Sequence, residues 1–216
     1  MATVVDINSD EGKVRLQNAK SNKSFHEWIQ VVFSKQKFHS GCGLRTTAIL
    51  LTAAEYARSN PTQKFIPECQ QPFTEKGLMD SENFKAISSF EKLDKVGTTL
   101  DEVCRLMKSY NYNIKSFKAS ETSLKDFRAL LAEVCKSQNS LMGVNYCLKT
   151  LQFKLPYGHH SPIAAYDDKT DSVLIMDTWP DHGEYWVDTS LLWESMDTLD
   201  IDSNERRGFY VLYNDI

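Results

Sequence analysis

Four residues spread along the chain could together perform nucleophilic catalysis: Gln36, Cys42, His159 and Asp177. A nucleophilic thiol needs a base within hydrogen-bond reach, and the base needs a third group that orients it. His159 suits the base, because Asp177 can accept from one ring nitrogen while the other nitrogen faces the thiol. Gln36 lies six residues before Cys42, where its amide could join the backbone N–H of Cys42 in stabilising an oxyanion. Residue types alone leave other roles open: a small buried hydrophobe, a strand histidine and a turn aspartate.

Cys42 lies where a loop enters a long apolar helix. Residues 45–58 contain no Pro or Gly and are mostly apolar on every side, which predicts a helix buried in the core. The run Arg-Ser-Asn-Pro at 58–61 is expected to end this helix, because proline cannot continue it. The first N–H groups of a helix lack partners and carry partial positive charge, so a thiol there has a lowered pKa. Gly41 and Gly43 would let other chain segments or a substrate backbone come close.

His159 and Asp177 are predicted to lie at the same end of one β-hairpin. The polar stretch 167–171 reads as a turn between a strand that begins at His159 and a strand that ends at Asp177. Strands are also expected at 112–117, 141–146, 186–187 and 208–213.

Helical patterns dominate the first two thirds of the chain. Helices are expected at 10–18, at 25–33, after a capping box formed by Thr99 and Glu102, at 124–134 and at 191–199. The prolines and the glycine of residues 59–95 interrupt any period, so short helices or a functional surface loop are expected there. Helices that precede antiparallel strands indicate an α+β fold.

The composition is that of a globular protein of ordinary size. With 216 residues, 41% of them hydrophobic and 25% charged, the chain can form a core, and we expect one domain over residues 1–216. The net charge of -4 argues against nucleic acid as a partner, and no apolar run is long enough for a membrane span. The start of the chain lacks the features of a signal peptide, so we expect a cytoplasmic location; secretion without a cleaved signal would be invisible here.

The five cysteines favour a reducing compartment. Their number is odd, their spacing is wide and there is no C-x-x-C, so neither a disulfide framework nor a metal-ligand motif is indicated. We therefore expect no firmly bound metal or cofactor. The residues are Cys42, Cys69, Cys104, Cys135 and Cys147.

Four separated blocks of the chain have the spacing of one family. The blocks are Gln36 with Cys42-Gly43-Leu44; Gly158-His159-His160-Ser161-Pro162 and the aliphatic strand after it; Leu174-Ile175-Met176-Asp177; and Leu192-Trp193-Glu194-Ser195-Met196 with Asp200 and Arg207-Gly208-Phe209. In these blocks the chain resembles the phytochelatin synthases, in particular their short prokaryotic members. The resemblance covers nearly the whole chain in order and is weakest over residues 59–95.

The resemblance implies a papain-like cysteine protease fold with a Cys42–His159–Asp177 triad and Gln36 in the oxyanion hole. In that family the thiolate attacks the amide between Cys and Gly of glutathione, and glycine leaves. The γ-glutamylcysteinyl thioester then passes to water or to the amine of a second glutathione. Glutathione and related γ-glutamyl peptides are thus the implied substrates, and a homodimer is left open.

The resemblance also implies a set of substrate-binding residues. Arg207, a planar bidentate donor, suits the α-carboxylate of the γ-glutamyl unit, and Asp200 suits its α-amino group. The alternative for these two is a surface ion pair. The full set is Gly97, Thr98, Gly158, Asp200 and Arg207. We see no Cys-rich C-terminal extension like that of eukaryotic members, so Cd²⁺ or Zn²⁺ would stimulate the reaction as glutathione–thiolate complexes.

The chain departs from the family at positions that the family uses for the second glutathione. Segment 178–184 carries acidic residues where the family has bases, Leu148 precedes a lysine where the family has an arginine, and Arg45 replaces a small residue. We expect Asp181 and Glu184 to repel the acceptor, so that water takes the acyl group more often. Full phytochelatin synthesis, a papain-like protease or acyltransferase for another peptide or protein, and a catalytically idle scaffold or binding protein remain alternatives.

Overall fold

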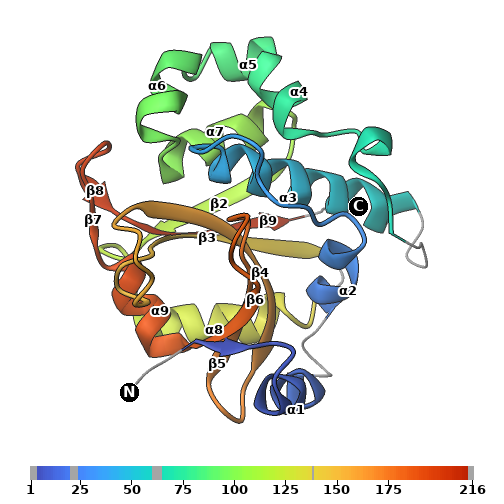
Figure 1. Ribbon diagram of the computed structural model, residues 1–216, viewed down its shortest axis with the longest axis vertical. Helices are drawn as coiled ribbons and strands as arrows, with labels where there is room; N and C mark the ends of the chain where they lie inside the picture. Colours follow the sequence, from blue (N-terminus) through green and yellow to red (C-terminus); the bar gives the residue numbers. More distant parts are fainter. Residues whose placement is uncertain (1–3, 20–23, 60–64, 138, 214–216) are drawn as a thin grey trace.

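A seven-stranded antiparallel sheet forms the body of the protein, in a computed structural model that describes residues 4–19, 24–59, 65–137 and 139–213 (Figure 1). Its strands, in spatial order, are β1 (Val5–Asp6), β6 (Glu184–Asp188), β5 (Ser172–Met176), β4 (Gly158–Asp167), β3 (Ser140–Cys147), β9 (Gly208–Tyr213) and β2 (Asn113–Lys118). The predicted hairpin is β4–β5, and the strand at 186–187 is longer than predicted. A short hairpin that was not predicted, β7 (Leu199–Asp200) with β8 (Glu205–Arg206), stands apart from the sheet.

Helix α3 (Cys42–Ser59) is the central helix of the fold and packs on β3 and β4. Every residue from 41 to 54 is buried, which confirms the prediction of a helix enclosed by the core. A helix that is apolar all round needs cover on all its faces, and the sheet supplies only one. The predicted stop at 58–61 lies partly outside the described residues, and the helix is described as far as Ser59.

The other helices cover the sheet and the outer faces of α3. In Figure 1, α3 and α7 lie on one side of the sheet, and α8 and α9 lie on the other. The capping box that begins α7 is confirmed, since Thr99 Oγ1 accepts from the Glu102 backbone and Glu102 Oε2 accepts from the Thr99 backbone. The helices are α1 (Asp10–Asn18), α2 (Ser24–Gln30), α7 (Leu100–Ser109), α8 (Leu124–Val134) and α9 (Thr189–Met196).

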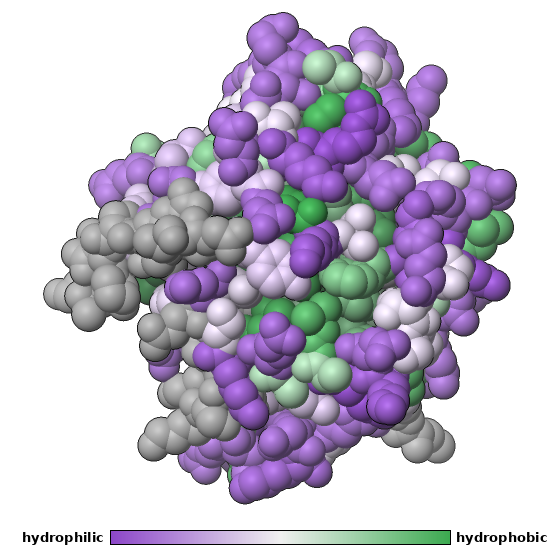
Figure 2. Space-filling view, turned by 180° about the vertical axis from the view of Figure 1, so that it is seen from behind, coloured by the Kyte–Doolittle hydropathy of each residue, from purple (hydrophilic) through white to green (hydrophobic). Residues whose placement is uncertain are grey.

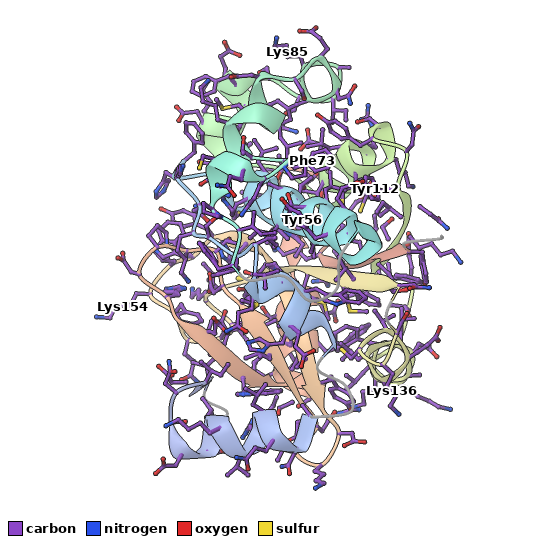
Figure 3. All side chains as sticks on the ribbon, turned by 90° about the vertical axis from the view of Figure 1, so that its right-hand side faces the viewer. Tyr56, Phe73, Lys85, Tyr112, Lys136 and Lys154 are labelled. Carbon is purple, nitrogen blue, oxygen red and sulfur yellow. The ribbon has the colours of Figure 1, made fainter. Side chains whose placement is uncertain are left out.

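Residues 65–96 form short helices that cover the side of α3 turned away from the sheet. They are a 3₁₀ turn at Glu68–Gln70 and the helices α4 (Glu75–Asp80), α5 (Glu82–Lys85) and α6 (Phe90–Val96). A second apolar cluster holds them to α3; its residues are Leu44, Ala48, Leu78, Phe84, Leu93 and Leu106. Figure 3 shows Tyr56, Phe73 and Tyr112 around α3, and the Phe73 ring packs edge-on against Tyr112. The expectation of short helices in this segment is confirmed.

The α+β class is confirmed by this arrangement of helices around one antiparallel sheet. On the face shown in Figure 2, hydrophobic residues gather near the middle and hydrophilic residues surround them. Within the described part of the chain, no helix has both the length and the apolar character needed to cross a bilayer.

Candidate active site

Cys42 is the first residue of α3 and is 8% exposed. The two flanking glycines are required by other chain segments. A Cβ on Gly41 would lie 2.0 Å from Glu75 Oε1, and a Cβ on Gly43 would lie 2.0 Å from Thr98 Oγ1. The close approach that the glycines predicted is therefore made by α4 and by the turn before α7, which fix the position of the thiol.

His159 and Asp177 meet at the same end of the β4–β5 hairpin, as the hairpin pattern predicted. His159 is the second residue of β4, Asp177 directly follows β5, and His159 Nε2 lies 2.7 Å from Asp177 Oδ1. Cys42 lies close enough to this imidazole to affect its pKa, and Nδ1 is the ring nitrogen that does not face Asp177. Burial disfavours the imidazolium, but the Asp177 carboxylate and Cys42 outweigh burial and raise the pKa of His159 to about 10. This arrangement stabilises an imidazolium beside a sulfur nucleophile.

Asp177 is completely buried and accepts hydrogen bonds on both oxygens. Oδ1 accepts from His159 and from the backbone N–H of Trp179 at 2.8 Å. Oδ2 lies 2.9 Å from His182 Nδ1 and accepts from the Tyr185 hydroxyl at 3.0 Å. Burial alone would raise the pKa of this carboxyl, but His159, His182 and the backbone donor hold it far below its usual range. Sequence reasoning found Asp177 and His159 but missed His182, which lies in a turn with no periodic pattern.

Gln36 lies on the loop before Cys42 and is buried, but its amide is already engaged. Nε2 donates to the carbonyls of Phe38 at 3.0 Å and His39 at 2.7 Å, and Oε1 accepts from Thr178 at 3.4 Å. Both amide hydrogens thus hold the loop that leads to the nucleophile. The oxyanion role of Gln36 remains a prediction, and it requires the amide to exchange one of these carbonyls for the substrate.

The five predicted substrate-binding residues all line one cavity of about 380 Å³, together with Cys42 and His159. This volume lies in the range of small-molecule sites. The five are Gly97, Thr98, Gly158, Asp200 and Arg207. Asp200 and Arg207 form the ion pair that the alternative named, with Arg207 Nη2 3.8 Å from Asp200 Oδ1, but the pair is buried, since each residue is only 8% exposed. The guanidinium lies over Gly158, where a Cβ would come within 2.9 Å of it.

Several buried polar atoms of the cavity residues have no hydrogen-bond partner among the described residues. They are Thr98 Oγ1, Asn145 Oδ1, His160 Nδ1 and Arg207 Nε. An unpaired buried donor or acceptor costs about 1–3 kcal/mol, so such atoms fit a site that receives a polar ligand or ordered water. These four residues offer a ligand one cation, Arg207, and three neutral side chains. His160 is neutral because burial and the charge of His159 lower its pKa to about 3.

Asn145 and His160 were not predicted as site residues. They face each other directly across β3 and β4, and Asn145 Nδ2 lies 2.8 Å from His160 Nε2. His160 Nε2 also lies 3.1 Å from the carbonyl oxygen of Thr98. The pairing of two adjacent strands could have suggested this contact, but the sequence offered no reason to prefer it.

A second buried carboxylate, Glu75 of α4, holds the loop before Cys42 from the other side. Its oxygens accept from the backbone N–H groups of Lys37 at 2.8 Å and Phe38 at 3.0 Å. Arg45, which is fully buried on α3, donates to Glu75 from Nε and Nη2 and to Glu68 from Nη2 at 2.9 Å. Arg45, which replaces a small residue of the family, is therefore a structural brace whose guanidinium is engaged by two carboxylates.

Comparisons with known proteins agree with the family pattern. The model of the family described as phytochelatin synthase matches residues 1–209. The chain is 27% identical to glutathione gamma-glutamylcysteinyltransferase 3 of Lotus japonicus over 214 residues, which are 96% of this chain and 42% of that protein. The corresponding enzyme 1 of Arabidopsis thaliana is 26% identical, with 96% and 41% covered. The chain thus spans about two fifths of the length of these relatives.

Among solved structures, a fragment of prointerpain A from Prevotella intermedia aligns with a TM-score of 0.43 and 11% identity. The alignment covers 88% of this chain and 68% of that fragment.

Proposed function

This chain belongs to the phytochelatin synthase family, and on that premise we propose that it cleaves glutathione through a thioester on Cys42. The sulfur attacks the carbonyl carbon of the Cys–Gly amide, and the amide C–N bond breaks. Glycine leaves with a proton from His159, and the γ-glutamylcysteinyl group remains on Cys42. Water or the amine of a second glutathione then attacks the thioester and gives its proton back to His159.

The observation that carries this proposal is the contact of Cys42 with an imidazole that Asp177 holds at 2.7 Å. A protonated His159 serves the leaving group, because an amine must be protonated as the C–N bond breaks. The raised pKa of His159, about 10, keeps that proton available at neutral pH. The helix N-terminus at Cys42 adds partial positive charge beside the developing oxyanion.

Recognition of the γ-glutamyl unit is assigned to Arg207 and Asp200. The Arg207 guanidinium faces the cavity with its Nε unpaired among the described residues, while Nη1 is fixed by the Leu199 carbonyl at 2.7 Å and the Thr198 hydroxyl at 3.0 Å. A guanidinium held on one side can receive a carboxylate on the other. Asp200, 3.8 Å away, then lies beside the α-amino group of the same ligand.

We further propose that water competes well with a second glutathione for the thioester, although the reason differs from the one expected. Asp181 is exposed on the turn after β5, and Glu184 faces His26 at 3.4 Å; neither belongs to the described residues that line the cavity. The cavity itself carries three carboxylates, on Asp94, Asp200 and Asp202, against two cations, on Lys95 and Arg207. A glutathione acceptor has carboxylates at both ends, so these groups would oppose its entry.

The test is to incubate the protein with glutathione, with and without Cd²⁺ or Zn²⁺, and to separate the thiol products by chromatography. We expect γ-glutamylcysteine and glycine as the main products, with stimulation by the metals acting through glutathione–thiolate complexes. Cys42→Ser should abolish both products, whereas Cys69→Ser, at an exposed cysteine, should change neither. Equal turnover by Cys42→Ser and the wild type would refute the proposal.

A second candidate function is a peptidase or acyltransferase for another peptide. The observation that favours it is an apolar rim around the cavity: Val96, Tyr157 and Ile201 are 46%, 52% and 81% exposed and all line it. Glutathione has no large apolar side chain that would use this rim. A panel of γ-glutamyl and ordinary dipeptides with apolar and polar second residues separates the two functions by their relative kcat/KM values.

A further inference from the structure

We propose that His182 is a positioning residue for the triad and fixes the rotation of the Asp177 carboxylate through its second oxygen. This inference rests on the proposed cysteine chemistry, because it concerns the group that orients His159. A carboxylate presents two equivalent oxygens and can turn about its bond to Cβ. A donor on Oδ2 therefore decides how firmly Oδ1 is directed at His159.

The geometry makes His182 a direct partner of the carboxylate. Its Nδ1 lies 2.9 Å from Asp177 Oδ2, on the side opposite His159 Nε2 at 2.7 Å from Oδ1. Two imidazoles thus share one buried carboxylate. The triad becomes a row of four groups, Cys42, His159, Asp177 and His182, in which the last is 14% exposed and reaches the surface.

The imidazole of His182 is itself held in place from two directions. The ring of Phe153, on the loop between β3 and β4, stacks on it with centroids 4.2 Å apart and an interplanar angle of 23°. Lys35 Nζ donates to the backbone carbonyls of both Asp177 and His182, at 2.6 Å each. The turn between β5 and β6 is therefore pinned at both residues, and the side chain of His182 has one well-defined direction.

Two buried phenols donate to the same carboxylate oxygen as His182. The hydroxyl of Tyr185 donates to Oδ2 at 3.0 Å and that of Tyr146 at 3.4 Å, and burial raises the pKa of both phenols well above the usual range. They remain neutral donors, as does the backbone N–H of Trp179. The charged groups nearby are the Lys35 ammonium, Glu184, which acts on Lys35, and His159 itself. Of the donors to Oδ2, His182 is closest to solvent.

The consequence of this contact concerns the pH up to which His159 keeps its proton. Asp177 raises the pKa of His159, so a carboxylate that turns away from the imidazole lowers that pKa. Loss of the His182 donor should therefore weaken the pair of Cys42 and His159 first at alkaline pH. Asn places an N–H donor near the position of Nδ1, while Leu has a similar size and no donor.

The test compares His182→Asn with His182→Leu and uses the rate at which iodoacetamide alkylates Cys42, which requires no substrate. We expect Cys42 of His182→Leu to be alkylated about tenfold more slowly at pH 8, which is the effect of losing one hydrogen bond to a charged group. The alkaline limb of its rate–pH profile should also lie at lower pH. His182→Asn should match the wild type in both. The control His26→Asn removes a histidine that pairs with Glu184 and should change neither.

A second readout is the strongly deshielded proton of the hydrogen bond between His159 and Asp177 in the proton NMR spectrum. It should persist in His182→Asn and disappear by exchange in His182→Leu. Unchanged rates and spectra in both variants would overturn the proposal, and so would equal losses in both together with lowered melting temperatures. The NMR result stands even if Cys42 of the wild type reacts no faster than the buried Cys104 and Cys135, an outcome that would refute the proposed cysteine chemistry instead.

Discussion

Two buried carboxylates flank the nucleophile, and they differ in the kind of donor that each accepts. Asp177, on the sheet side, receives the titratable imidazoles of His159 and His182. Glu75, on the helical side, receives backbone N–H groups and the guanidinium of Arg45. Both carboxylates are fully buried.

This difference in donors matches a difference in the proposed roles: Asp177 orients the imidazole, and Glu75 holds the loop before Cys42. Arg45 holds Glu75 with two of its donors, Nε and Nη2. An imidazole can give up or take a proton, so the contacts of Asp177 change with the protonation of its partners. Asp177, the carboxylate proposed to orient the base, has two imidazoles among its partners, whereas Glu75, which supports the loop, is held by a guanidinium and backbone N–H groups.

The largest expected effect is on turnover, at Asp177. Asp177→Asn should leave the protein folded but lower kcat on the order of 10⁴-fold, as the same change does in serine proteases, because the amide favours the wrong tautomer of the base. Initial rates and far-ultraviolet circular dichroism on the same sample measure the two parts. Nearly full activity would reduce Asp177 to a turn residue and remove the contrast with Glu75.

The next effect is on stability, at Glu75. Glu75→Gln leaves the buried Arg45 without its main partner and should lower the free energy of unfolding by about 3–5 kcal/mol, measured in urea. The matched control is Glu82→Gln, which removes an exposed partner of Lys85 and should cost less than about 1 kcal/mol. A loss at Glu75 no larger than at Glu82 would show that Glu75 does not brace the loop.

The pair of His159 and Asp177 should also make the free energy of unfolding depend on pH. The pKa of His159 is raised to about 10 in the folded protein, whereas an unfolded histidine titrates near about 6.5. The folded state thus keeps a proton that the unfolded state loses, so this part of the stability is full below about pH 6.5 and is lost as pH rises toward 10.

Melting temperatures of the wild type and of His159→Gln between pH 6 and 10 measure this slope. The wild type should lose stability across the window, and the variant should be flatter. An equal slope in both would mean that the proton on His159 contributes nothing to folding.

The two sides of the nucleophile also differ in how far the sequence predicted them. A helix start and a hairpin are local patterns, so Cys42 could be placed on α3, and His159 and Asp177 could be placed at one end of β4–β5. The partners of Glu75 lie on a loop and a helix about 30 to 40 residues earlier in the chain. No period or spacing connects them, and segment 65–96 was readable only as short helices.

The same limit applies to single side chains within the predicted site. Gln36 was correctly expected on the loop beside Cys42, but the direction of its amide depends on which carbonyls the loop presents. His182 lies five residues after Asp177, in a turn that Lys35, on the loop between α2 and α3, holds through two backbone carbonyls. Local patterns therefore predicted which elements carry the site, while the contacts between distant segments decided what each side chain does.

The smallest expected effect concerns a third carboxylate, that of Asp202, which lines the cavity. Asp202 follows the β7 strand, and burial together with the charge of Asp200 raises its pKa. Asp202 is exposed but lines the cavity, where its carboxylate opposes a glutathione acceptor, whereas Asp181 is exposed on a turn outside the cavity lining and would act through screening solvent. Asp202→Lys should therefore raise the ratio of oligomer to γ-glutamylcysteine by about three- to fivefold, the effect of at most roughly 1 kcal/mol from one exposed charge pair. Asp181→Lys should raise it by less than about twofold. The ratio is measured by chromatography at low and high salt, and the gain from Asp202→Lys should shrink as salt screens it. A larger effect at Asp181 would place the acceptor outside the cavity, on the turn that carries His182.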